Sequence, residues 1–211
     1  MELPTNKQQT MITITNTRPE HIEQLVIHQQ VCFPTMCADD WMNAAMFASQ
    51  LAVFPEGQHV ALDGDRVVGQ SSTFRIGDAC LKPHTYRAIT ANNYFTLHEP
   101  DGSWLYGADM SVHPAYRNQG IASALYSTRK ELIRKLGMRG IVAGGALPGF
   151  HTYAHEMSVE AYVAAVVADT IFDPTLSVQL RNGFVVRELL RGYVDGGELV
   201  NDDATLLVWE A

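Results

Sequence analysis

One segment near the middle of the chain constrains the fold more than any other. Residues 104–112 form an apolar run that predicts a buried strand, His113 and Pro114 end it, and helical spacing begins after Gly120. The first N–H groups of a helix have no partner within the helix and lie at the positive end of its dipole. This order of strand, short turn and helix therefore predicts an anion site suited to a pyrophosphate.

Two residues of the turn support this interpretation. Gly120 lacks a Cβ, so a ligand can approach the backbone closely, and Arg117 can add a charge-assisted hydrogen bond. The pattern R-x-x-G-x-A is short, however, and a solvated turn capped by glycine fits it equally well. Residues elsewhere in the chain have to decide between the two interpretations.

The rest of the chain predicts one mixed α/β domain over residues 11–211, preceded by a polar extension at residues 1–10. Apolar and alternating runs predict strands at residues 12–15, 59–62, 66–76, 104–112, 141–143, 184–194 and 205–210. Helical spacing predicts helices at residues 19–29, 39–53, 120–136, 158–168 and 173–182, with Asp39 as N-cap of the second and Gly137 as C-cap of the third. Residues 77–102 show no clear period and predict a long loop, a kind of segment that is often functional.

Composition excludes several classes of protein. The 211 residues are 46% hydrophobic, which is enough for a self-sufficient core. The formal net charge of −8 argues against nucleic-acid binding and membrane-surface binding, because both need a basic footprint, and it slightly favours a cationic ligand. The longest apolar run, at residues 161–168, is too short for a bilayer span of ~20 residues.

The N-terminus and the cysteines indicate a compartment. The first ten residues are polar and lack the apolar region of a signal peptide. Three cysteines, Cys32, Cys37 and Cys80, match neither a zinc site nor a disulfide framework. We therefore expect a reducing, cytoplasmic environment and no metal.

Residues 107–122, G-A-D-M-S-V-H-P-A-Y-R-N-Q-G-I-A, resemble the acetyl-CoA motif of the GNAT N-acetyltransferase superfamily. That motif is a strand ending in V-x-P, then [Q/R]-x-x-G-x-[G/A], then an amphipathic helix. Further stretches are similar to the acetyltransferase domain that some bacterial proteins fuse to a nitrilase-like hydrolase domain: L-Y-G-A-D, R-K-E-L, G-I-V-A-G-G, D-P-T-L and N-G-F. The resemblance covers residues 11–210.

The resemblance implies a fold, a reaction and a cofactor site. The fold is a central, mixed, mostly antiparallel sheet of about seven strands, splayed at an acetyl-CoA cleft and flanked by helices. The reaction moves an acetyl group from acetyl-CoA, as co-substrate, directly to an amine of a small molecule or peptide. By position, pantetheine would run along Met110, Ser111 and Val112, and the pyrophosphate would lie at Gln119, Gly120, Ile121 and Ala122, with Arg117 and Asn118 at the rim.

The resemblance does not supply the acid and the base. Direct transfer needs an amine that has lost its proton. Relatives often carry a Glu where this chain has Tyr106, and Asp109 is expected on the opposite face of the strand because side chains alternate. The frequent Tyr acid is replaced by Gln179. We therefore predict Tyr106, at the start of a water chain, and His151 or Glu156 as the catalytic candidates.

Other interpretations remain open at this stage. Further acidic candidates are Glu99 and Asp101, and stand-in acids are Tyr116, Tyr126 and Tyr153. The substrate pocket is expected between residues 77–102 and residues 148–157.

Two positions that usually carry catalytic residues are replaced in this chain. An alternative hypothesis is therefore that the protein is a non-catalytic, regulatory module that binds acyl-CoA. A dinucleotide-binding fold is excluded, because no G-x-G-x-x-G follows the first strand, and the final strands offer an edge at which two copies could pair as a homodimer.

Overall fold

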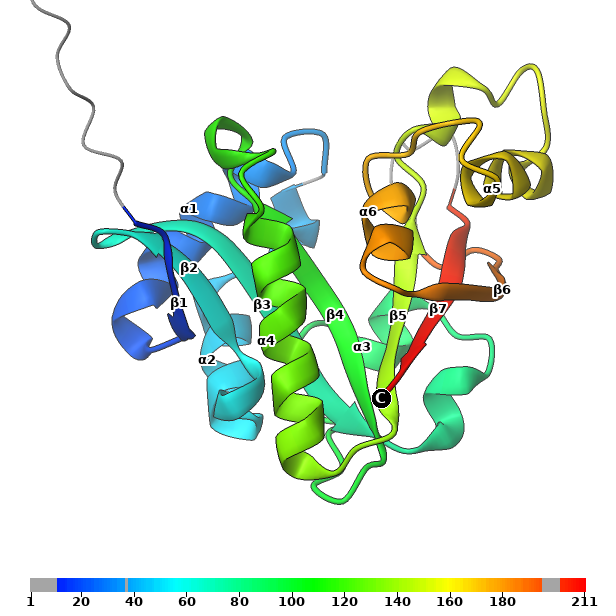
Figure 1. Ribbon diagram of the computed structural model, residues 1–211. Helices are drawn as coiled ribbons and strands as arrows, with labels where there is room; N and C mark the ends of the chain where they lie inside the picture. The colour runs from blue at the N-terminus through cyan, green and yellow to red at the C-terminus, as the bar shows by residue number, and fades with distance from the viewer. Residues whose placement is uncertain (1–10, 37, 195–201) are drawn as a thin grey trace, which may run out of the picture.

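The computed structural model describes residues 11–36, 38–194 and 202–211. Within these residues, seven strands form one sheet in the order β1-β2-β3-β4-β5-β7-β6 (Figure 1). All neighbouring strands are antiparallel except β4 and β5, which are parallel. The expectation of a mixed, mostly antiparallel sheet flanked by helices is confirmed.

The elements follow the predicted order. The strands are β1 (Thr13–Asn16), β2 (His59–Asp63), β3 (Arg66–Ile76), β4 (Trp104–Val112), β5 (Gly140–Ala146), β6 (Val185–Leu190) and β7 (Ala204–Glu210). The helices are α1 (Ile22–Cys32), α2 (Ala44–Val53), α3 (Tyr86–Thr90), α4 (Ile121–Leu136), α5 (Val159–Val167) and α6 (Leu176–Arg181). No helix in the described part of the chain is long and apolar enough to cross a membrane. The predicted extension at residues 1–10 lies outside the described residues.

The helices cover the two faces of the sheet. On one face, which we call the α1 face, α1 and α2 pack on the first strands, and Ile89 of α3 packs with Phe74 and Tyr106. On the other, the α4 face, α4, α5 and α6 share a hydrophobic core with Leu105 and Leu207 (Figure 1). The sheet is therefore the middle of three layers, and each face has its own apolar core.

Two predicted segments differ from the sequence-based expectation. Helix α2 begins after Asn43, whose side chain accepts hydrogen bonds from the N–H groups of Ala45 and Met46, so Asp39 is not its N-cap. Residues 77–102 are not a plain loop, because they contain a 3-10 turn at Asp78–Leu81 and helix α3. In the first region a different local cap, Asn43, sets where the helix begins. In the second, the helical segments are four and five residues long, too short to give a clear apolar period.

Strand β4 contains a β-bulge at Ala108. The register between β3 and β4 shifts by one residue next to Ser72, which lies opposite Asp109. The extra residue reverses the alternation of side chains, so Asp109 lies on the same face of the sheet as Tyr106. The expectation that these two residues point to opposite faces is therefore wrong, because the period of two was counted through an unpaired residue.

The buried side chain of Arg129, on α4, holds this bulge. Its Nε donates to Ser71 Oγ at 2.7 Å, and its Nη2 donates to the carbonyl oxygens of Ser72 at 3.3 Å and Asp109 at 2.5 Å. The residue is 2% exposed, so these hydrogen bonds satisfy a charge that has almost no access to water. The absence of a side chain at Gly107 makes space for this guanidinium, since a Cβ there would come within 2.7 Å of Arg129 Nη1.

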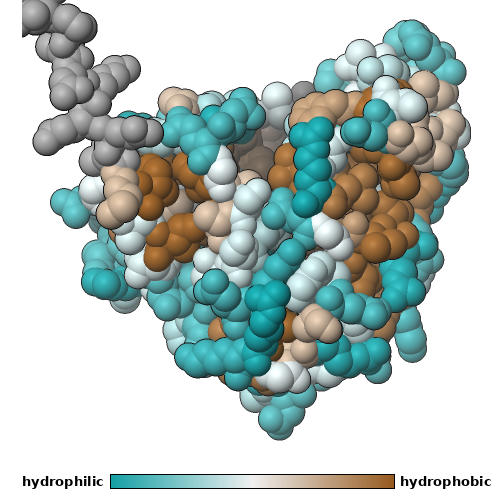
Figure 2. Space-filling model, viewed as in Figure 1, coloured by the Kyte–Doolittle hydropathy of each residue, from teal (hydrophilic) through white to brown (hydrophobic). Residues whose placement is uncertain are grey.

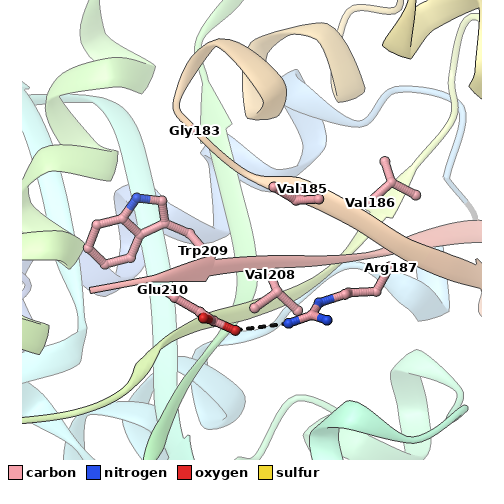
Figure 3. A pocket seen from close by; sticks show the side chains of 7 residues that line it. All are labelled: Gly183, Val185, Val186, Arg187, Val208, Trp209 and Glu210. Carbon is pink, nitrogen blue, oxygen red and sulfur yellow. Dashed lines mark hydrogen bonds and ion pairs between the residues drawn. The ribbon is translucent and has the colours of Figure 1, made fainter.

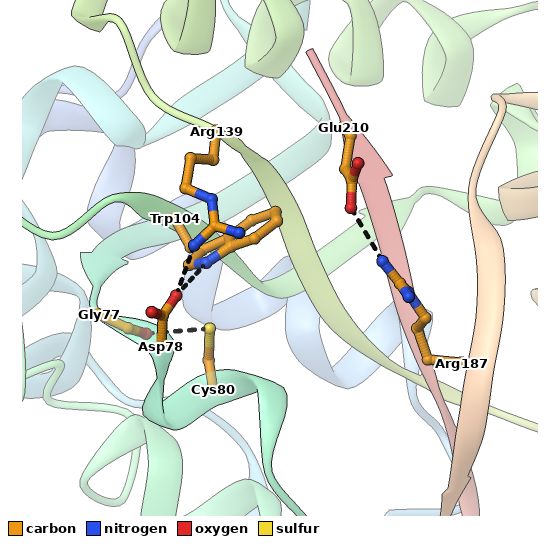
Figure 4. A network of polar contacts seen from close by, with 7 residues as sticks. All are labelled: Gly77, Asp78, Cys80, Trp104, Arg139, Arg187 and Glu210. Atoms are coloured by element: carbon orange, nitrogen blue, oxygen red, sulfur yellow. Dashed lines mark hydrogen bonds and ion pairs between the residues drawn. The ribbon is translucent and has the colours of Figure 1, made fainter.

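The opposite end of β4 is tied to β5. Asp78 Oδ1 accepts hydrogen bonds from Trp104 Nε1 and from Arg139 Nη1, each at 2.8 Å, and the Arg139 guanidinium lies 4.5 Å from the centre of the Trp104 ring (Figure 4). Trp104 begins β4 and Arg139 immediately precedes β5. The two parallel strands are therefore fastened where both begin.

We expect Arg129→Met to destabilise the protein by about 3 kcal/mol. The substitution keeps much of the volume but leaves Ser71 Oγ and two carbonyl groups short of a buried donor, at ~1–3 kcal/mol for each unsatisfied group. Urea unfolding measures the change. The control is Lys135→Met at an exposed position of the same helix, which should stay within ~0.5 kcal/mol; equal losses in both variants would contradict the role of Arg129.

Candidate active site

Strands β4 and β5 diverge halfway along their length. Their pairing covers four residues of each strand and ends at Gly107 and Ala143. Beyond that point residues 108–112 stay with β3 and residues 144–146 stay with β7. We call the resulting gap the fork; Figure 1 shows the two strands separating, and Figure 2 shows a hollow between the two halves of the molecule. The facing strand edges carry backbone groups that can pair with an extended ligand.

The N-terminus of α4 lies beside the fork and is open to solvent. Gly120 is its N-cap with φ 80° and ψ 0°, a left-handed conformation that favours glycine. A Cβ at Gly120 would meet nothing within 4 Å, so the space in front of the helix is free. Arg117, Asn118 and Gln119 are exposed around it. The first-turn N–H groups therefore face a site that an anion can reach.

A neutral Cys–His–Ser cluster lies on the α1 face of β4, beyond the fork point. His28 Nε2 is 3.0 Å from Ser111 Oγ and 3.3 Å from Cys32 Sγ. Burial lowers the pKa of His28 to about 4 and raises the pKa of Cys32 to about 11. The thiol therefore keeps its proton at neutral pH, which is the wrong state for a nucleophile.

The carboxyl group of Asp109 lies on the same face. It accepts hydrogen bonds from Gln29 Nε2 at 2.9 Å and from Gln70 Nε2. Burial raises the pKa of Asp109, and the hydrogen bonds from the two amides, together with the charge of Arg129, partly offset that rise. This half-buried carboxyl group and its two glutamines were not predicted as a unit, because they come from three distant elements.

Tyr106 lies below the fork point and is fully buried. Its hydroxyl is 2.8 Å from the Tyr193 hydroxyl and 2.8 Å from His84 Nε2. Burial raises the pKa of Tyr106 well above its usual value, so the phenol is neutral. No sequence pattern indicated Tyr193 or His84, which lie in irregular segments.

The predicted bases of the loop after β5 are both exposed. His151 Nδ1 is 2.6 Å from the Pro148 carbonyl oxygen, and Glu156 is 3.3 Å from His155 Nε2. These contacts lie within the loop itself. The assignment of His151 or Glu156 as the base stays a prediction.

The structure separates two acidic candidates from the fork and places Gln179 beside the β5 strand that borders it. Glu99 and Asp101 precede Trp104, so they lie at the fastened end of β4 and not at the fork. Gln179 is buried, and its Oε1 lies where a Cβ on Gly145 would meet it at 2.6 Å. Its Oε1 has no hydrogen-bond partner in the described part of the chain.

A second hollow lies at the edge of the sheet, over β6 and β7 (Figure 3). Arg187 and Glu210, its charged residues, form an ion pair at 2.9 Å, and the rest of its lining is mainly apolar. Among the described residues, no three His, Cys, Asp or Glu side chains gather into a metal-binding group. The fork is therefore the stronger candidate site.

Comparison with known proteins identifies relatives of the whole chain. Residues 22–157 match the family model described as "Acetyltransferase (GNAT) family". The chain is 37% identical over 199 residues to "Probable hydrolase YhcX" of Bacillus subtilis, covering 94% of this chain and 38% of that protein. It is 33% identical over 201 residues to "Uncharacterized N-acetyltransferase YkwB" of the same species, covering 94% of this chain and 88% of that protein. The chain thus spans well under half of the first relative.

Solved structures share the fold at low sequence identity. The "GNAT-like decarboxylase" GphF, in complex with isobutyryl-CoA, has a TM-score of 0.75 at 21% identity, covering 94% of this chain and 98% of that one. The "loading GNATL domain of CurA" from Lyngbya majuscula has a TM-score of 0.81 at 18% identity, covering 95% and 98%. Naa50 of Arabidopsis thaliana has a TM-score of 0.58 at 16% identity, covering 95% and 99%.

We expect His28 to make the protein less stable in mild acid. The pKa of His28 is about 4 in the folded state and about 6.5 in the unfolded state. The contribution of His28 to the free energy of unfolding is therefore fully present above pH 6.5 and is lost as the pH falls from 6.5 to 4. Between pH 7 and pH 5 the loss is about 2 kcal/mol. Urea unfolding of wild type and His28→Asn at both pH values measures it.

The comparison isolates one histidine. Burial also lowers the pKa of His59 to about 4, and His59 contributes the same slope in both proteins. The difference between wild type and His28→Asn therefore reports His28 alone. Parallel losses of stability in the two proteins would contradict the assignment.

Proposed function

We propose that this chain, which belongs to the acetyltransferase (GNAT) family, transfers an acetyl group from acetyl-CoA to a primary amine of a small molecule or peptide. The observation that carries the proposal is the fork between β4 and β5, which opens beside the free N-terminus of α4. An extended thioester can pair with a strand edge there while its phosphates bind the helix. Both features come from one continuous segment of chain.

The cofactor is proposed to bind along this segment. Pantetheine would pair with the backbone of β4 at Met110, Ser111 and Val112, which lie beyond the last pair with β5. The pyrophosphate would accept hydrogen bonds from the turn before α4 and from its first residues, at Gln119, Gly120, Ile121 and Ala122. Arg117 and Asn118 would contact it from the rim of the site, where both are exposed.

The chemistry proposed is direct transfer. The acceptor nitrogen attacks the thioester carbon, loses a proton, and coenzyme A leaves as its thiol. An acyl-enzyme on Cys32 is not part of this scheme, because burial keeps that thiol protonated. The acceptor is proposed to enter from the α1 face, where Asp109 and its glutamines line β4, and the net charge of −8 favours a cationic amine.

A second candidate activity is the loss of carbon dioxide from a carboxyacyl-CoA. The observation that favours it is the higher TM-score to the GNAT-like decarboxylase GphF, 0.75, than to Naa50, 0.58. Decarboxylation also needs no base to deprotonate an amine. The carboxylate leaves as carbon dioxide, the bond electrons move to the thioester enolate, and the α-carbon takes a proton.

One set of assays separates the activities. Thiol release from acetyl-CoA is measured with spermidine, an arylamine and a short peptide with a free N-terminus, and malonyl-CoA is followed by mass spectrometry without an acceptor. Amine-dependent thiol release supports the transferase, and conversion of malonyl-CoA to acetyl-CoA supports the decarboxylase. Calorimetric binding of CoA with neither reaction would leave the regulatory acyl-CoA-binding module.

We expect Gly120→Glu to weaken CoA binding at least tenfold. The substitution places a side chain and a negative charge in the free space before α4, where the pyrophosphate is proposed to bind. The matched control is Gly137→Glu at the other end of the same helix. Gly137 also has a positive φ, 63°, and open space around its Cβ position, so it carries the same strain and the same charge. Equal CoA affinities of the two variants in calorimetry would reject the site.

We expect His151→Ala and Glu156→Gln to lower turnover less than tenfold at saturating acetyl-CoA. Loss of a general base costs about 10²-fold or more. Both side chains are exposed and contact partners within their own loop. A loss of 10²-fold in either variant would instead assign the base to this loop, as the sequence predicts.

A further inference from the structure

A continuous chain of hydrogen bonds runs from the fork to the protein surface. Its members are Tyr193, which follows β6, Tyr106 on β4, and His84, which precedes α3. The Tyr193 and Tyr106 hydroxyls are 2.8 Å apart, and the Tyr106 hydroxyl is 2.8 Å from His84 Nε2. Both phenols are buried, with Tyr106 at 0% and Tyr193 at 3% exposure, whereas His84 is only partly buried.

The hydrogen bonds in this chain have one consistent direction. His84 Nδ1 is 2.7 Å from the Lys82 carbonyl oxygen, which can only accept, so Nδ1 carries the proton and Nε2 is an acceptor. Tyr106 therefore donates to His84 Nε2, and Tyr193 donates to Tyr106. The Tyr193 oxygen accepts a hydrogen bond from the backbone N–H of Gly144, and its remaining lone pair can accept a proton at the inner end.

That inner end lies at the fork. A Cβ on Gly144, the first residue of β5 beyond the last pair with β4, would come within 2.0 Å of Tyr193 Cζ and 2.3 Å of its hydroxyl oxygen. The carboxyl group of Asp109, across the fork on β4, is close enough to raise the pKa of Tyr193. The Tyr193 hydroxyl is therefore placed between the two diverging strands on the α1 face.

We propose that Tyr193, Tyr106 and His84 form a proton relay that carries the proton of the acceptor amine away from the fork; the relay rests on the proposed transferase function. As the nitrogen bonds to the thioester carbon, its proton passes to Tyr193, the Tyr193 proton passes to Tyr106, and the Tyr106 proton passes to His84 Nε2. Each phenol ends neutral. The imidazolium then releases a proton to solvent.

The surroundings suit His84 to this role. Burial lowers its pKa, so the imidazole is neutral and able to accept a proton at pH 7. The rings of Tyr106 and Tyr193 contact it, and Tyr86 of α3 and Asp109 of β4 lie beyond, next to Tyr193. The relay thus gives the site a base although no carboxylate occupies the position of Tyr106.

The test uses, among the amines that the enzyme acetylates, the one whose nitrogen is least basic. That amine is already deprotonated over the pH range measured, so its own titration does not change the rate. We expect Tyr106→Phe and His84→Gln each to lower kcat about 10²-fold, with the KM for acetyl-CoA within about twofold of wild type. Gln at position 84 can accept the hydrogen bond from Tyr106 but cannot take the proton. The expected wild-type rate is level above neutral pH, whereas that of His84→Gln keeps rising with pH.

Tyr86→Phe is the matched control. Its hydroxyl donates to Asn93 Oδ1 at 2.6 Å, and its ring packs against Tyr193, so the variant loses a hydroxyl from the same cluster outside the relay. We expect kcat within about threefold of wild type. Unchanged kcat in His84→Gln, or an equal loss in Tyr86→Phe, overturns the relay alone. Failure of wild type to turn over any amine while binding CoA overturns the proposed function and the relay with it.

Discussion

The buried guanidinium of Arg129 secures the place where the sheet divides. It reaches from α4 through the α4 face and donates to groups of both β3 and β4 at the bulge, including the carbonyl oxygen of Asp109. On the opposite face, the carboxyl group of the same Asp109 is held by Gln29 and Gln70. One residue of β4 is thus fixed from both sides, and the side chains of the fork are positioned relative to it.

The fork depends on this arrangement together with the contacts at the other end of β4. Asp78, Trp104 and Arg139 fasten the two parallel strands where they begin, and pairing stops after four residues. From there each strand follows its other neighbour. The site consequently has two unlike walls: open backbone edges with a helix N-terminus on the α4 face, and a buried polar network on the α1 face.

Much of the fold was predictable because its signals are local. The strand ending at Val112, the turn, and a helix capped by Gly120 and Gly137 lie in one continuous segment, and the structure has all of them. The bulge was not predictable, because Ala108 is an ordinary strand residue. Arg129 was not predicted to be buried, because arginine is almost never fully buried and nothing in the local pattern separates it from the other charged residues of the helix. Tyr193 meets Tyr106 across 87 residues of chain, a separation that no local pattern encodes.

The contact between Gly144 and Tyr193 has a consequence for how this protein can diverge. Gly144 has an ordinary strand position, and what forbids a side chain there is the phenol ring lying against it. Positions 144 and 193 are therefore expected to covary. A descendant that gains even alanine at 144 has to give up the aromatic ring at 193, and with it the inner hydroxyl of the buried network. Glycine at the first and tyrosine at the second should be inherited together or lost together.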